Sequence, residues 1–135
     1  MIGVVVCTHS KLAPALLDAA TMILGSFERS ASVTVEPGDS GEKIVDELTD
    51  AIKSVESGSG TIVLCDMFGG TPSNVSLSLL SQDIEVVTGV NLPMLLKLFT
   101  CRDKELSDVA KIIQSHGRDN ILVAGALMRA SEKDE

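Results

Sequence analysis

The chain has 135 residues, the size of one domain with a single hydrophobic core. Hydrophobic residues make up 44% of it, yet no apolar run approaches the roughly 18 residues that a membrane span requires, so we expect no insertion into a membrane. The formal net charge of −8 would repel a nucleic-acid backbone, which excludes nucleic acid as an expected partner. With three Phe and no Trp or Tyr, aromatic stacking cannot be the main means of recognition.

Five segments have the pattern of β-strands. The continuous apolar runs at 2–8 and 61–65 are typical of strands that are buried on both faces of a parallel sheet. Residues 31–36 alternate between apolar and polar side chains, which indicates a strand nearer the edge. Two further strands are expected at 84–88 and 120–124.

Helical patterns separate these strands. Apolar residues recur at helical spacing over four segments, 11–24, 41–56, 73–80 and 105–115, the last of which we expect to end at Gly117. Strands and helices therefore alternate, which predicts an α/β domain with an open, mostly parallel sheet and helices on both faces. We place this domain at residues 1–125 and a C-terminal tail at 126–135.

The cysteines predict no redox or metal chemistry. Cys7, Cys65 and Cys101 lack the close spacing of a metal site, and two of them lie in apolar runs, where a thiol packs as a small hydrophobic group. No signal peptide precedes the first strand, so we expect a reducing, cytoplasmic location and no metal or other cofactor.

A histidine and an aspartate follow two of the central strands directly. His9 comes after the first strand and Asp66 after the third. The edge-like second strand favours a strand order of 2-1-3-4, in which these two residues are neighbours at the switch point where ligands bind. A carboxylate that accepts one imidazole N–H leaves the lone pair of the other nitrogen free as a nucleophile.

The residues after Asp66 have the pattern of an anion-binding loop. Gly69 and Gly70 would let backbone N–H groups approach an anion, and Thr71 is expected to cap a helix whose N-terminus opens beside His9. Ser10, expected to begin the first helix, would add further donors. This combination predicts a phosphoryl group carried on histidine.

Each of these features also has a purely structural explanation. A lone histidine at a strand end often packs or caps, and Gly-Gly-Thr-Pro is often only a turn into a helix. His116 is explained as a basic residue at a helix C-terminus. The glycine loop lacks the signatures of a P-loop and of a dinucleotide fold. The coincidence of His9, Asp66 and the glycines at one sheet edge nevertheless favours a functional site.

Three blocks of the sequence, 2–10, 66–74 and 88–95, resemble the IIA domain of the mannose-type (mannose/fructose/sorbose) family of the bacterial phosphoenolpyruvate-dependent sugar phosphotransferase system (PTS). The resemblance implies that His9 accepts a phosphoryl group from the phosphocarrier protein HPr and passes it to a IIB component, which phosphorylates a sugar during uptake. It implies further that Asp66 holds His9, that Thr71 lies near the phosphoryl group, and that Asn91, in a matching loop, contributes to phosphoryl binding.

The resemblance also implies a homodimer, in which a final antiparallel strand of each subunit is exchanged. Residues 121–128 are very apolar for a chain end, which agrees with an exposed edge of this kind, although Leu127 and Met128 would also pack on their own sheet. The family often has an aromatic residue where this chain has Ser73. Four apolar residues around the site form either a docking patch or part of the core: Met67, Phe68, Met94 and Leu95.

Two other functions remain open at this point. The first is a regulatory module in which phosphorylation of His9 controls protein contacts rather than sugar uptake. The second is a small anion-binding or dimerisation domain in which His9 is inert.

Overall fold

Four parallel strands form the centre of the molecule in a computed structural model, which describes residues 1–133. The strands lie in the order β2-β1-β3-β4, as the sequence predicts, and all three pairings are parallel. Their bounds are β1 (Gly3–His9), β2 (Ser30–Val35), β3 (Thr61–Cys65) and β4 (Ile84–Thr88).

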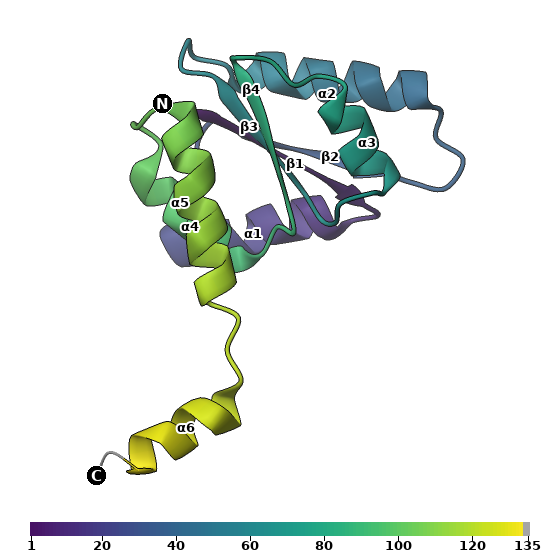
Figure 1. The fold of residues 1–135 in the computed structure, drawn as a ribbon. Coiled ribbons are helices and arrows are strands. Elements are labelled where there is room, and N and C mark those ends of the chain that lie inside the picture. The colour runs from purple at the N-terminus through teal and green to yellow at the C-terminus, as the bar shows by residue number, and fades with distance from the viewer. Residues whose placement is uncertain (134–135) are drawn as a thin grey trace.

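Helices cover both faces of this sheet, which confirms the predicted fold class (Figure 1). Helices α1, α4 and α5 pack on one face, and α2 and α3 pack on the other. The helices are α1 (Leu12–Leu24), α2 (Gly41–Val55), α3 (Thr71–Leu77), α4 (Leu92–Cys101), α5 (Leu106–Asp119) and α6 (Ala124–Lys133). None of the helices in residues 1–133 is both long enough and apolar enough to cross a membrane.

The central strands are mostly apolar because each contributes side chains to two cores. In β1, Val4 and Val6 belong to the core beneath α1, α4 and α5, whereas Val5 and Cys7 belong to the core beneath α2. A strand that is buried on both faces has few positions for a polar side chain, and a polar group there must be hydrogen-bonded. In β1 the first exposed residue is the last one, His9.

The predicted end of α5 at Gly117 is wrong. The helix continues to Asp119, and Gly117 is buried within it against the start of α4. A Cβ atom at this position would overlap Met94 Cγ, and Asn91 Nδ2 donates to the Gly117 carbonyl at 3.3 Å. The glycine therefore allows two helices to approach each other closely instead of terminating one of them.

The predicted fifth strand at 120–124 is also absent. After α5 the chain passes through 121–123 without joining the sheet, and α6 projects away from the rest of the molecule (Figure 1). A strand needs a neighbouring strand to pair with its N–H and C=O groups, and this segment has none within residues 1–133. Leu127 and Met128 are 55% and 62% exposed, so they do not pack on their own sheet. Of the predicted tail, 126–133 is helical, whereas 134 and 135 lie outside the described residues.

Candidate functional site

His9 and Asp66 meet at the edge of the sheet where the strands end. His9 is the last residue of β1, and Asp66 follows directly after β3, the neighbouring strand. From β1 the chain continues to β2 on one side, whereas from β3 it continues to β4 on the other. The pair therefore lies at the switch point of a doubly wound sheet, where ligands bind in folds of this kind.

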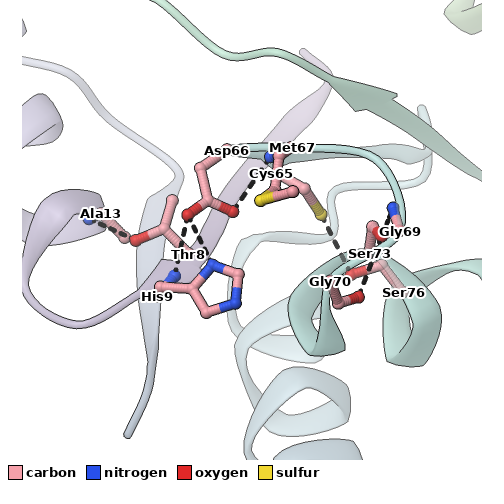
Figure 2. A network of polar contacts seen from close by, with 10 residues as sticks. All are labelled: Thr8, His9, Ala13, Cys65, Asp66, Met67, Gly69, Gly70, Ser73 and Ser76. Carbon is pink, nitrogen blue, oxygen red and sulfur yellow. Dashed lines mark hydrogen bonds and ion pairs between the residues drawn. The ribbon is translucent and has the colours of Figure 1, made fainter.

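The Asp66 carboxylate holds His9 through both its ring and its backbone (Figure 2). Asp66 Oδ2 lies 2.8 Å from His9 Nδ1 and accepts the backbone N–H of His9 at 3.2 Å, while Oδ1 accepts the backbone N–H of Met67 at 3.1 Å. A carboxylate acceptor assigns the ring proton to Nδ1, so Nε2 carries a lone pair. Because the His9 side chain is 47% exposed, a partner protein can reach the ring.

Asp66 is ionised at neutral pH. Partial burial raises the pKa of its carboxyl group, but the hydrogen bonds from the His9 ring and backbone, together with the charge of His9, outweigh this effect and bring the pKa below its usual value. The site thus keeps a negative charge on the Nδ1 side of the imidazole.

The turn between β1 and α1 differs from the prediction at Ser10. Helix α1 begins at Leu12 rather than at Ser10, which has a positive φ of 53°. The backbone N–H of Ser10 donates to the Val35 carbonyl at 2.9 Å, so it is not available to an anion. The buried Thr8, which the sequence analysis did not single out, accepts the N–H of Ala13 at 2.7 Å and fixes the start of α1. Threonine often accepts a backbone N–H at the start of a helix, so the sequence could have indicated this role for Thr8.

Gly70 contacts the imidazole on the side away from Asp66. A Cβ atom at this position would lie 2.7 Å from His9 Cε1 and 3.2 Å from Nε2, so only glycine allows the loop to approach the ring this closely. The preceding Gly69 has a φ of +95°, a conformation that favours glycine. Gly70 therefore lies beside His9, as the sequence predicts, whereas the N–H of Gly69 donates to Ser73 Oγ at 2.9 Å and is not available to an anion.

Thr71 is not the N-cap of α3, as predicted, but its first residue. Gly70 occupies the cap position, and α3 is only seven residues long. The Thr71 side chain is exposed and its hydroxyl makes no hydrogen bond within residues 1–133. The backbone N–H groups of Gly70 and Thr71 likewise have no acceptor within this described part of the chain.

Asn91 follows β4, at the start of α4, and has a structural role there. Its Oδ1 accepts the N–H of Met94 at 3.0 Å and its Nδ2 donates to the Gly117 carbonyl, so both ends of the amide are engaged. The structure does not connect Asn91 with the His9–Asp66 pair, and the predicted phosphoryl contact is not supported. The polar side chain is used to cap α4 and to join it to α5.

The four candidate docking residues fall into two pairs. Met67 and Phe68 are 53% and 71% exposed in the loop that follows Asp66. Met94 and Leu95 are only 3% and 0% exposed, because the buried face of α4 packs them into the core. The last two therefore cannot contribute to an exposed patch, and for them the predicted alternative of a core position is the correct one.

The remaining candidates behave as structural residues. His116 lies in the last turn of α5, as predicted. Cys7, Cys65 and Cys101 are buried free thiols. Burial raises the pKa of Cys7 to about 12 and also raises the pKa of Cys65, so both thiols beneath the site remain protonated and unreactive at neutral pH.

The fold and the site define a small doubly wound α/β domain that presents an aspartate-bound histidine at the switch point of its sheet. The sequence profile of the EIIA-man family, described as "PTS system fructose IIA component", matches residues 3–117. The chain belongs to this family of PTS IIA components.

Similar proteins agree with this assignment. The chain is 30% identical over 105 residues to the PTS system fructose-specific EIIA component of Bacillus subtilis (strain 168), covering 76% of this chain and 72% of the relative. It is 28% identical over 124 residues to the PTS system mannose-specific EIIAB component of Escherichia coli (strain K12), covering 89% of this chain but spanning only 38% of that relative's length. A solved structure, the PTS IIA protein associated with the fucose utilization operon from Streptococcus pneumoniae, superposes with a TM-score of 0.83 at 25% identity and covers 93% of this chain and 95% of its own.

Proposed function

We propose that this chain is a phosphocarrier that accepts a phosphoryl group on His9 Nε2 from phosphorylated HPr and passes it to a IIB component during sugar uptake in the cytoplasm. The observation that carries the proposal is the hydrogen bond between Asp66 and His9 Nδ1, which leaves the other ring nitrogen as the nucleophile. In the first step the Nε2 lone pair forms a bond to phosphorus, and the donor's bond to phosphorus breaks with its electron pair going to the donor. The second step repeats this exchange with the IIB component as acceptor.

Asp66 supports the chemistry on one side of the ring, and the glycine loop supports it on the other. Phosphorylation of Nε2 while Nδ1 keeps its proton makes the ring cationic, and the adjacent carboxylate stabilises this charge. The N–H groups of Gly70 and Thr71 are the donors that we propose for the phosphoryl oxygens, since both lack an acceptor within the described residues. Met67 and Phe68 supply exposed apolar surface for a partner.

Phosphoryl labelling tests the proposed function. We expect incubation with phosphoenolpyruvate, enzyme I and HPr from the same source to place one acid-labile, base-stable phosphoryl group on Nε2 of His9, mapped by mass spectrometry and by NMR of the ring nitrogens. Adding the IIB component should remove the label. A label on another residue, or no label, would refute the proposal, whereas a label that no IIB component removes would favour the regulatory alternative.

We propose in addition that the chain forms a homodimer through the open edge of β4. This strand has β3 as its neighbour and no other strand within residues 1–133. A groove of about 330 Å³ runs between β4 and α5 and is lined by residues 85–88 of the strand together with Ala110, Lys111 and Gln114 of the helix. The segment 121–123 belongs to no helix or strand, and its three apolar side chains are between 62% and 76% exposed. In a dimer, the segment 121–123 of one copy would pair with the open β4 edge of the other, and the reverse.

A charge placed in this segment should separate the subunits. We expect the parent protein to sediment as a dimer and Leu122→Asp to sediment as a monomer, because the carboxylate would be buried without a partner at the interface. Met22→Asp is the matched control, since Met22 is an exposed apolar residue on α1 and should tolerate the charge without loss of the dimer. A monomeric parent protein would contradict the proposal.

A further inference from the structure

The loop that faces His9 Nε2 is built from two adjacent glycines, which by themselves leave its conformation poorly fixed. Gly69 is exposed and Gly70 is half-buried, yet Gly70 lies close enough to the ring to exclude any larger residue. The position of the loop relative to Nε2 therefore depends on contacts from neighbouring residues.

One buried hydroxyl makes such contacts from both sides of the glycine pair (Figure 2). Ser73 Oγ accepts the N–H of Gly69 at 2.9 Å and donates to the Gly70 carbonyl at 3.0 Å. The Ser73 side chain is inaccessible to solvent, so water does not compete for its two hydrogen-bond partners. Its hydroxyl closes the turn that packs against His9.

Helix α3, which carries Ser73, also contacts β3, the strand that directly precedes Asp66. Ser76 Oγ donates to the Pro72 carbonyl at 2.7 Å and lies 3.4 Å from Cys65 Sγ, at the end of β3. The Asp66 carboxylate near Nδ1 and the glycine turn near Nε2 are thus both positioned relative to the end of β3.

We infer that Ser73 is a positioning residue for phosphoryl transfer, which holds the Gly69-Gly70 turn at the distance from His9 Nε2 that the phosphoryl group requires. The inference rests on the proposed function. The sequence signal was a serine three residues beyond a glycine pair, a spacing at which hydroxyls bond to nearby backbone groups.

Ser73→Ala tests this role in the complete chain, with phosphorylated HPr as the donor. We expect kcat for phosphoryl uptake to fall about 5- to 20-fold, the range for one to two net hydrogen bonds, with KM for the donor unchanged because the docking surface is untouched. Ser73→Thr, which keeps the hydroxyl, should restore most of the rate. Ser78→Ala is the matched control, since Ser78 is an exposed serine that follows the same helix and also donates to a backbone carbonyl, that of Val75.

Amide hydrogen exchange at Gly69 provides a second measurement that depends on neither rescue nor turnover. The Gly69 N–H should exchange slowly in the parent protein and in Ser78→Ala, and faster in Ser73→Ala. An unlabelled parent protein would overturn the proposed function and this inference together. A labelled parent protein with an unchanged kcat in Ser73→Ala, or with equal Gly69 exchange in both proteins, would overturn the role of Ser73 alone.

Discussion

Replacing His9 with alanine is expected to reduce phosphoryl labelling to background while the fold persists. The described residues offer no equivalent nucleophile beside Gly70, because Cys7 and Cys65 are buried and protonated. The substitution removes a half-exposed ring at the end of a strand, together with one hydrogen bond to Asp66, so the loss of unfolding free energy should be only about 1 kcal/mol. Labelling with phosphoenolpyruvate, enzyme I and HPr measures the first effect, and urea unfolding measures the second.

His116→Ala is the control for this experiment. His116 is the other histidine of the chain and lies in the last turn of α5. We expect this variant to be labelled at the parent rate. If His9→Ala took up as much label as the parent protein, the assignment of His9 as the carrier would be wrong.

The positions of His9 and Asp66 could be predicted because buried strands are easy to recognise. A strand that packs on both faces is mostly apolar, and its end is marked by a strongly polar or charged residue, here His9 after the first strand and Asp66 after the third. The strand order then follows from which strands are polar enough for an edge, as 31–36 is. These two steps place both side chains at one switch point without any knowledge of their contacts.

The contacts that fix the surroundings could not be predicted in this way, because they depend on tertiary structure. Arg102 is 4% exposed and donates to the carbonyls of Ile2, Glu28 and Arg29, which are far from it in the sequence. Asn91 resembles a site residue in sequence, but it joins α4 to α5 instead. A short polar side chain fits a cap, a turn or a ligand site equally well, and only the packed neighbours decide among these.

The predicted strand at 120–124 failed for a related reason. Its apolar residues indicate that the segment is buried against something, but not whether its own chain or a second copy provides that surface. Within residues 1–133 no strand lies beside it, and the same pattern fits a strand that pairs with a second copy.

Asp66→Ala should slow phosphoryl uptake by about 10²- to 10³-fold without unfolding the protein. The substitution removes the acceptor of the Nδ1 proton, so the ring loses both its fixed orientation and the charge that stabilises its cationic, phosphorylated form. Asp66→Asn separates these two effects. Its amide oxygen can still accept the Nδ1 proton but carries no charge, so we expect a rate between those of the parent protein and Asp66→Ala. Rapid-quench labelling with phosphorylated HPr measures all three rates, and equal rates would remove Asp66 from the mechanism.

The parent protein and Asp66→Asn should also differ in their free energy of unfolding, by an amount that depends on pH. The pKa of Asp66 is lower in the folded protein than its usual value, so its ionised form is favoured by folding. The resulting stabilisation is fully present above the ordinary aspartate pKa of about 3.9 and is lost as the pH falls through the lowered folded value. Parent protein and Asp66→Asn should therefore differ by about 1 kcal/mol in urea unfolding at pH 7, and the difference should shrink as the pH is lowered below about 4. A difference that stayed unchanged well below pH 4 would mean that the ionised Asp66 carboxylate does not stabilise the folded protein.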